Sequence, residues 1–155
     1  MVTKALYEDL DEILELQKLA YKSEAELVGD YTIPPLTQTL DGMKQDFVDQ
    51  VILKSEICGK IVGSVRACEQ DGVCYIGRLI VHPEHQNKGI GKELMRSVEE
   101  HFGCCRSFSL FTGLKSEKNL HVYGSIGYRK VREEKVNDKL TLVYLEKANV
   151  GQPSL

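Results

Sequence analysis

The segment 86–91, with the sequence Gln-Asn-Lys-Gly-Ile-Gly, combines two glycines with three polar side chains. It follows an apolar run and precedes a stretch with helical spacing, which predicts that it opens a helix. The first turn of a helix has unpaired N–H groups and the positive end of the helix dipole, and both attract anions. Because glycine has no Cβ, Gly89 and Gly91 would let a diphosphate approach the backbone closely. The segment therefore predicts a phosphate-binding loop; a helix entry that merely uses glycine for a turn is the alternative.

Two common nucleotide-binding motifs do not fit this loop. A Walker loop needs Gly-x-x-x-x-Gly-Lys-Ser/Thr. Here Gly91-Lys92 is followed by Glu93, and the residue five positions before Gly91 is Gln86. A dinucleotide fingerprint needs a third glycine three residues after the second, where this chain has Leu94. The letters of the loop therefore favour neither of these nucleotide-binding motifs.

A metal site is not expected. The spacing His101-x-x-Cys104-Cys105 has no second pair of residues with ligand spacing, so we predict no bound zinc. The chain has five cysteines, an odd number, and no export signal at its start. We therefore expect the cysteines to be reduced thiols in a cytoplasmic protein.

Charge and hydropathy exclude two further classes of partner. The 155-residue chain has a net charge of −3 and a pI of about 5.8, whereas binding to nucleic acid phosphates needs a basic surface. No apolar run approaches the roughly 18 residues of a membrane span. We expect neither nucleic acid nor a membrane as the partner, and a cationic substrate is compatible with the charge.

The elements that must position the loop follow from hydrophobic periodicity and turn residues. Helices are predicted over residues 10–24, around 40–48, over 89–102 and over 119–126. Strands are predicted over residues 2–5, 51–58, 61–68, 73–81, 107–112, 128–134 and 140–146. Segment 30–35 is predicted to be non-helical because it contains two adjacent prolines, and Gly103 is predicted to be a left-handed helix cap.

This order of elements predicts a mixed α/β fold. An antiparallel meander is followed by a strand–loop–helix–strand unit, which implies one parallel pair in an otherwise mostly antiparallel central sheet flanked by helices. The length fits one domain, predicted over residues 1–147, with a frayed tail over 148–155. In the hairpin around Gln70-Asp71-Gly72, we expect Glu69 to face Val73 and Cys68 to face Cys74.

Two segments of the chain together resemble the GCN5-related N-acetyltransferase (GNAT) superfamily. Residues 77–91 resemble its coenzyme A motif, in which a Leu-x-Val-x-Pro strand leads into Gln/Arg-x-x-Gly-x-Gly/Ala. Gln86, Gly89 and Gly91 match the three defining positions. Residues 119–128 resemble the Asn-x-x-x-x-Tyr-x-x-x-Gly-Phe/Tyr segment of the family. The resemblance covers roughly residues 2–147.

The resemblance implies that acetyl-coenzyme A (acetyl-CoA) binds between two strands, 73–81 and 107–112, that splay apart. The backbone of Leu79 and Val81 would pair with the pantetheine arm as an added strand, and N–H groups of the loop would hold the pyrophosphate. The residues that the resemblance assigns to the cofactor are Leu79, Ile80, Val81, Gln86, Asn87, Lys88, Gly89, Ile90, Gly91, Asn119 and Tyr123.

The chemistry implied by the resemblance is direct attack of a neutral amine on the thioester. Tyr123 would donate a proton to the leaving thiolate. Many family members have a glutamate on the strand before the loop, but the aligned position here is Tyr75, so that base does not carry over. Glu69, at the end of the preceding strand, and Glu26, near the exit of the first helix, are the candidate bases. Glu24 and Asp30 are further options, and any of these acids can equally be a solvated surface residue.

Region 24–36 usually helps to form the acceptor site in this family. Here Tyr31, Ile33 and the prolines lie beside three acids, a composition that suits a small cationic amine; an ordinary surface loop is the alternative. We therefore expect an N-acetyltransferase that acts on a primary amine of a small molecule. A protein lysine or N-terminal acetyltransferase, or a non-catalytic acyl-CoA sensor, is the alternative function, and a homodimer is one option for the assembly.

Overall fold

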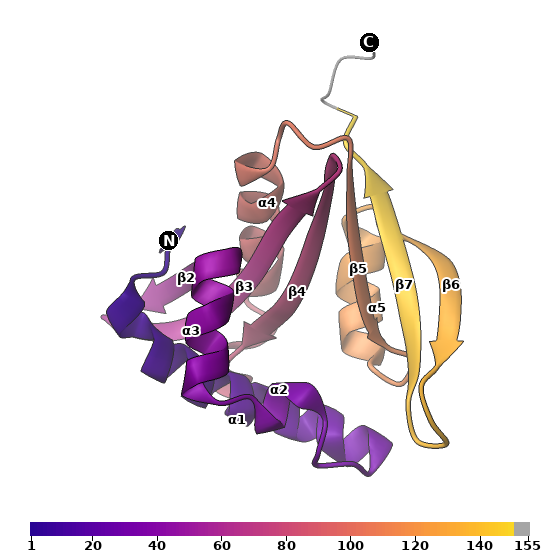
Figure 1. Ribbon diagram of the computed structural model, residues 1–155, viewed down its shortest axis with the longest axis horizontal. Helices are drawn as coiled ribbons and strands as arrows, with labels where there is room; N and C mark the ends of the chain where they lie inside the picture. Colours follow the sequence, from indigo (N-terminus) through magenta and orange to yellow (C-terminus); the bar gives the residue numbers. More distant parts are fainter. Residues whose placement is uncertain (151–155) are drawn as a thin grey trace.

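The computed structural model describes residues 1–150, which form one mixed sheet with helices on both faces (Figure 1). The seven strands have the order β1-β2-β3-β4-β5-β7-β6, and among them only β4 and β5 are parallel neighbours. The predicted mixed sheet with one parallel pair is confirmed. The strand bounds are β1 (Val2–Lys4), β2 (Val51–Ile57), β3 (Lys60–Gln70), β4 (Val73–Val81), β5 (Ser107–Gly113), β6 (Arg129–Lys135) and β7 (Thr141–Ala148).

The helices divide between the two faces of the sheet (Figure 1). They are η1 (Tyr7–Asp9), α1 (Leu10–Val28), α2 (Pro34–Thr37), α3 (Leu40–Asp49), η2 (Pro83–His85), α4 (Ile90–His101) and α5 (Glu117–Ser125). Side chains of α1 and α3 such as Ile13 and Met43 pack with Ile80 of β4 on one face. Leu94 of α4 and Tyr123 of α5 belong to the core on the other face. Each amphipathic helix thereby buries its apolar stripe against the sheet.

The two halves of the sheet separate between β4 and β5. These strands pair only from Val73 with Ser107 to Tyr75 with Ser109, and beyond this point they diverge (Figure 1). A β-bulge in β4 accompanies the separation, since Ser64 and Arg66 of β3 face Ile80 and Gly77, which leaves β4 one residue longer over this stretch.

The bulge explains why the strands part. Arg78, inside the bulge, has a φ of 52°. A bulge bends its strand and increases the local twist, so the end of β4 turns away from β5. From Ile76 to Val81, the edge of β4 that faces β5 therefore lacks a strand partner within the described residues.

A buried polar network attaches α1, α2 and α3 to β3. Arg66 of β3 is buried and donates to Asp46 of α3 at 2.6 Å and to Gln17 of α1 at 2.7 Å. Gln17 is fully buried and donates to the main-chain carbonyl of Pro35 in α2 at 2.9 Å. Because buried polar groups are costly unless they are paired, this network determines how the three helices sit on the sheet.

The first helix and the prolines differ from the prediction. α1 continues to Val28, where Gly29, with a φ of 68°, ends it in a left-handed cap. α2 begins at Pro34 and includes Pro35, so the non-helical segment is shorter than predicted. The first positions of a helix leave their N–H groups unpaired, so proline costs no hydrogen bond there. The predicted left-handed cap at Gly103 is wrong, because its φ is not positive.

The predicted register of the β3–β4 hairpin is wrong by one residue. Gln70 faces Val73, Glu69 faces Cys74, and Cys68 faces Tyr75. The loop therefore has only two residues, Asp71 and Gly72, with φ angles of 53° and 81°. Positive φ at both central positions is the requirement of the type I′ turn, whose twist matches that of the flanking strands.

The last strand passes the predicted domain limit. β7 includes Ala148, and the amide of Asn149 donates to the carbonyl of Arg106 at 2.9 Å. The rest of the predicted tail, residues 151–155, lies outside the described residues. Within residues 1–150, no helix combines the length and hydropathy that a membrane crossing requires.

Candidate active site

The loop of segment 86–91 lies between the end of β4 and the start of α4. η2 follows β4, and the side chain of Gln86 then donates back to the carbonyl of Val81 at 3.5 Å. Asn87 and Gly89 have φ angles of 63° and 84°, so the chain makes two left-handed steps before the helix begins at Ile90. Asparagine and glycine are the residues that adopt this conformation most readily.

The geometry of the loop suits a diphosphate. Helix geometry leaves the N–H groups of Gly89, Ile90 and Gly91 without acceptors inside α4. A Cβ added to Gly89 would meet no atom within 4 Å, so the space above it is open. Lys88 and Lys92 are exposed on either side. The loop therefore offers backbone donors and a positive helix end to an open space, with two exposed lysines adjacent in the sequence.

Gly91 has no conformational or packing requirement of its own. The φ angle of Gly91 is not positive, so other residues could adopt its backbone conformation. A Cβ at this position would make ordinary contacts of 3.8 Å with Val81 and 4.0 Å with Leu79. The missing side chain therefore leaves the first turn of α4 open to the close approach of another molecule.

The side chains of the β4 segment next to the loop face the two cores. Leu79 and Val81 pack against the core on the α4 side, and Ile80 packs against the core on the α1 side. Their backbone groups at the strand edge therefore remain to interact with a ligand between β4 and β5. An extended molecule can add to such an edge as a strand does.

Tyr123 lies at the other side of the opening, on α5. Its side chain is 6% exposed, and within the described residues its hydroxyl makes no hydrogen bond. Burial raises the pKa of this phenol well above the usual value, and the nearby Tyr21 and Glu24 raise it further. Tyr123 therefore keeps its proton at neutral pH, and the hydroxyl is free to donate it. Asn119, one turn earlier, donates to Thr112 of β5 at 3.4 Å and holds α5 against β5.

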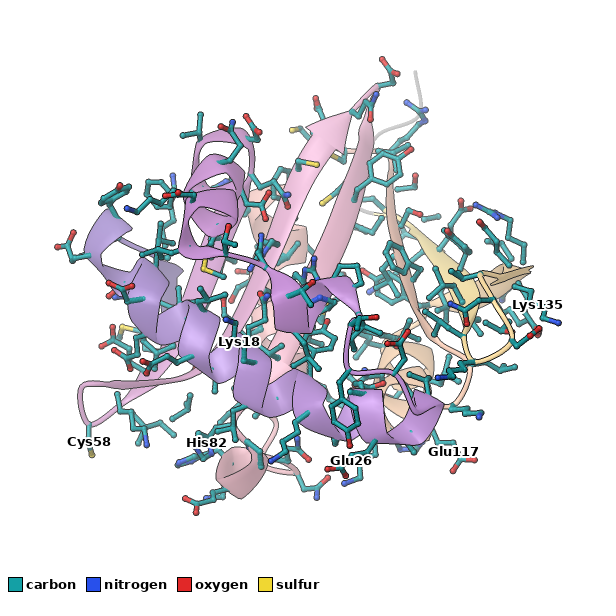
Figure 2. All side chains as sticks on the ribbon, turned by 60° about the horizontal axis from the view of Figure 1, so that its bottom comes forward. Lys18, Glu26, Cys58, His82, Glu117 and Lys135 are labelled. Carbon is teal, nitrogen blue, oxygen red and sulfur yellow. The ribbon has the colours of Figure 1, made fainter. Side chains whose placement is uncertain are left out.

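The end of α1 supplies an acid close to Tyr123. Ser116, buried just before α5, donates a hydrogen bond to the Glu24 carboxylate. This hydrogen bond joins the end of α1 to the start of α5. Figure 2 shows the two helix ends close together, marked by Glu26 on α1 and Glu117 on α5. Burial raises the pKa of Tyr21, which lies one turn before Glu24 on α1; Glu24 adds to the increase, and two arginines oppose it.

The two acids predicted as bases lie elsewhere. Glu69 is exposed near the hairpin tip and faces Cys74, at the end of β4 that stays paired with β5. Glu26 is exposed at the surface (Figure 2). Each residue of a helix turns by about 100°, so Glu26 lies about 200° around α1 from Glu24, on nearly the opposite face. The structure brings neither of them to Tyr123. Glu24, one of the further options for the base, lies there instead, together with Tyr21 and Ser116. The sequence reasoning missed Tyr21 and Ser116; the shared helix face of Tyr21 and Glu24 was the signal that could have found Tyr21.

A shallow aromatic cleft lies where β4 and β5 diverge. Its volume is about 310 Å³, and it is lined by Tyr75, Ile76, Ser109, Leu110, Phe111, Val131, Arg132, Tyr144 and Glu146. The rings of Phe111 and Tyr144 lie 5.4 Å apart, and the Arg132 guanidinium stacks 3.7 Å from the Tyr144 ring centre. Tyr75 and Phe111 are 46% and 55% exposed, an unusual exposure for aromatic side chains that form part of a sheet.

Residues 8–128 match the model of the acetyltransferase (GNAT) family. The matched range contains the loop at 86–91, both diverging strands and Tyr123. Among curated proteins, YqkA of Bacillus subtilis is 27% identical over 131 residues, which are 84% of this chain and 38% of that protein. The chain therefore spans well under half of the length of this relative.

Solved structures share the whole fold at low sequence identity. The PaiA N-acetyltransferase of Thermoplasma acidophilum, in complex with coenzyme A, has a TM-score of 0.80 and 17% identity over 96% of this chain and 98% of that one. The ribosomal-protein-S18-alanine N-acetyltransferase of Escherichia coli has a TM-score of 0.80 and 10% identity over 100% and 96%. The yncA protein of Salmonella typhimurium, solved with its cofactor acetyl-CoA, has a TM-score of 0.75 and 16% identity over 100% and 96%.

Proposed function

Because the chain belongs to the acetyltransferase (GNAT) family, with acetyl-CoA as the cofactor, we propose that it transfers an acetyl group to the primary amine of a small molecule. The observation that carries this proposal is the opening between β4 and β5, with the loop at 86–91 at one end and the unpaired Tyr123 hydroxyl at its side. An extended thioester cofactor needs these features together.

The residues of the opening fit the parts of the cofactor. N–H groups from Asn87 to Gly91 would hold the pyrophosphate, with Gln86 bracing the turn and Lys88 adding a positive charge. The free edge of β4 at Leu79–Val81 would pair with the amides of the pantetheine arm. Asn119 would contact the arm from the other side, beside Tyr123.

The acceptor amine must lose a proton before it attacks. A lysine-like amine has a pKa of about 10.4, so roughly one molecule in 2,500 is neutral at pH 7. Glu24 is the acid that supports this step best, because it lies near Tyr123 and its orientation is held by Ser116. We propose that Glu24, rather than Glu69 or Glu26, attracts the ammonium group and accepts its proton through water.

The leaving sulfur needs a proton in turn. A free thiol has a pKa of about 8.5, so its thiolate is a weak base and needs a hydrogen-bond donor close by. The Tyr123 hydroxyl, which has no hydrogen-bond partner within residues 1–150, supports this role. Its raised pKa keeps the phenol protonated and makes it a weaker acid, so a hydrogen bond to the thiolate is the first contribution we assign to it. Glu24 and Tyr123 then act at the two ends of the reaction, one on the nucleophile and the other on the leaving group.

The size of the cleft supports a small acceptor. A volume of about 310 Å³ lies at the lower end of the range for small-molecule sites. A protein amine is the second candidate, since the ribosomal-protein-alanine N-acetyltransferases share this fold. A peptide would need an open groove, and a sensor would need to bind the thioester without consuming it.

The proposal is tested by turnover. A panel of small primary amines and a panel of peptides with free N-termini or lysines are incubated with acetyl-CoA, and the release of free thiol is followed. We expect amine-dependent thiol release with members of the small-amine panel. Release with peptides alone would favour the protein acetyltransferase, and calorimetric binding of acetyl-CoA with no release in either panel would favour the sensor.

A further inference from the structure

Arg78 lies at the centre of the opening but has no role in the chemistry described above. The bulge of β4 puts it in the left-handed region, at a φ of 52°. An arginine in this conformation costs backbone energy that a regular strand would avoid. Arg78 follows Gly77 in β4. It lies two positions along the strand from Ile76, which lines the aromatic cleft.

The positive charge of Arg78 faces the region where the acceptor would bind. It lies on the side of the sheet covered by α1, because its charge acts on Tyr21 of α1 and on Arg66 of β3. The side chain is half-buried, and within residues 1–150 its guanidinium forms no hydrogen bond and no ion pair. A guanidinium without a partner beside an opening is available to bind an anionic group.

The neighbouring charges do not supply that partner. Arg66 is itself positive, and its charge is balanced by Asp46 at 2.6 Å. Glu24 also acts on Tyr21 and is held by Ser116, and within residues 1–150 it forms no ion pair with Arg78. Among the described residues, the positive charge of Arg78 is therefore left without an ion-pair partner in this part of the site.

The cofactor does not account for this charge. Its pyrophosphate is expected at the start of α4, and the chain reaches that point only after the rest of β4 and η2. The pantetheine arm that would lie along β4 has no anionic group. An anion bound at Arg78 would therefore come from the acceptor.

We infer that Arg78 binds a carboxylate of the acceptor, so that the acceptor carries both an amine and a carboxylate, as a free amino acid does. This inference rests on the proposed acetyltransferase function. A guanidinium offers a fork of two N–H donors that matches the two oxygens of a carboxylate. A single guanidinium balances one negative charge, whereas a phosphate monoester carries between one and two.

The two ends of such an acceptor match two fixed charges of the site. Glu24, beside Tyr123, attracts the ammonium group, and Arg78 on the bulge attracts the carboxylate. The exposed rings of Tyr75 and Phe111 line the aromatic cleft, which begins at Ile76, two positions along β4 from Arg78, and they would contact an apolar side chain. The site is therefore built for a zwitterion with an apolar substituent.

Matched acceptors test this inference by kinetics. Leucine and phenylalanine are compared with leucinamide and phenylalaninamide in the thiol-release assay. The amino acid amides have a less basic amine than the free acids, so a larger fraction of their amine is neutral at pH 7. This difference by itself would give the amides the higher rate. We expect the free acids to have the higher kcat/KM, by roughly tenfold or more, as for a lost charged hydrogen bond. The Arg78→Gln variant should abolish that preference and leave kcat/KM for the amides within about twofold.

Control variants distinguish a specific effect of Arg78 from the general effect of removing one positive charge. Gln makes the same demand on the left-handed backbone as Arg, so Arg78→Gln should fold. The matched control is Arg129→Gln, an exposed arginine of β6, which should keep the preference. Equal use of acids and amides by the unaltered protein, or an equal loss for both in Arg78→Gln, would overturn the inference while leaving the acetyltransferase proposal intact.

A binding measurement tests the inference without turnover. N-acetyl-leucine and N-acetyl-leucinamide, the two products, are titrated calorimetrically into the protein saturated with coenzyme A. Tighter binding of the acid, reduced about tenfold or more in Arg78→Gln, supports the inference even if no acceptor in the panel is turned over. Equal binding of the two products, or binding of neither, contradicts it.

Discussion

At the scale of single residues, the hydroxyl of Tyr123 is the group that distinguishes an enzyme from a binding module. The Tyr123 side chain is 6% exposed, its pKa is raised, and its hydroxyl makes no hydrogen bond within the described residues. Tyr123→Phe removes this oxygen and keeps the ring, so packing should survive. We expect turnover to fall by roughly 10²–10⁴-fold, the range for a positioned proton donor. The affinity for coenzyme A, measured by calorimetry, should change little. Near-normal turnover of Tyr123→Phe would show that Tyr123 contributes to packing and not to proton donation.

The acid on α1 gives the second prediction at this scale. Glu24→Gln keeps the size of the side chain and a hydrogen bond to Ser116 but removes the charge. We expect kcat/KM for amines to fall by roughly 10²-fold or more at pH 7, with a smaller loss at high pH, where the amine is already neutral. Glu26→Gln and Glu69→Gln are matched controls, because both acids are exposed away from Tyr123. A larger loss in either control than in Glu24→Gln would reassign the base.

At the scale of elements, the start of α4 carries the cofactor prediction. Gly89→Asp would put a negative side chain into the open space above the loop, where the diphosphate is expected. We expect at least a tenfold loss of coenzyme A affinity, about 1.4 kcal/mol. Gly59→Asp is the control, since Gly59 also has a positive φ, at 78°, and open space, but lies in the β2–β3 turn. Unchanged affinity in a folded Gly89→Asp variant would contradict the site.

The free edge of β4 gives a second prediction at the scale of helices and strands. If the cofactor adds to β4 as a strand, amides of the segment 79–81 that do not already bond to β3 gain an acceptor. We expect their hydrogen exchange to slow when coenzyme A is added. Amides of β2 that pair with β3, such as that of Leu53, should not change. Equal exchange at 79–81 with and without coenzyme A would exclude strand addition.

At the scale of the whole molecule, the Arg66 network connects the helical layer to the sheet. Asp46→Ala would leave the Arg66 guanidinium buried without its counter-charge. We expect the free energy of unfolding to fall by about 3 kcal/mol, as for a broken buried ion pair. Urea denaturation measures this loss. Asp49→Ala on the same helix is exposed and should cost under about 0.5 kcal/mol; a similar cost for both variants would show that the network contributes little.

Much of the fold could be predicted from local patterns. The strand at 73–81 has the predicted bounds, the helix predicted over 89–102 runs from Ile90 to His101, and the mixed sheet with one parallel pair is confirmed. The loop at 86–91 was recognisable because its glycines, its preceding strand and its following helix are all adjacent in the sequence. Hydrophobic periodicity and turn residues act over a few residues, so short segments contain the information.

Tertiary structure alone decided which side chains meet. Glu24 and Ser116 are 92 positions apart, yet they share a hydrogen bond because α1 crosses the sheet to reach the start of α5. Arg78 faces the site because of a bulge next to Gly77; a glycine inside a strand can signal a bulge, but the spacing does not show toward which segment the bulged residue turns. The sequence alone determined the order of elements and the position of the loop at 86–91 between a strand and a helix, whereas the choice among the acids depended on contacts between distant segments. Such contacts arise from the packing of whole layers, which a spacing along the chain does not record.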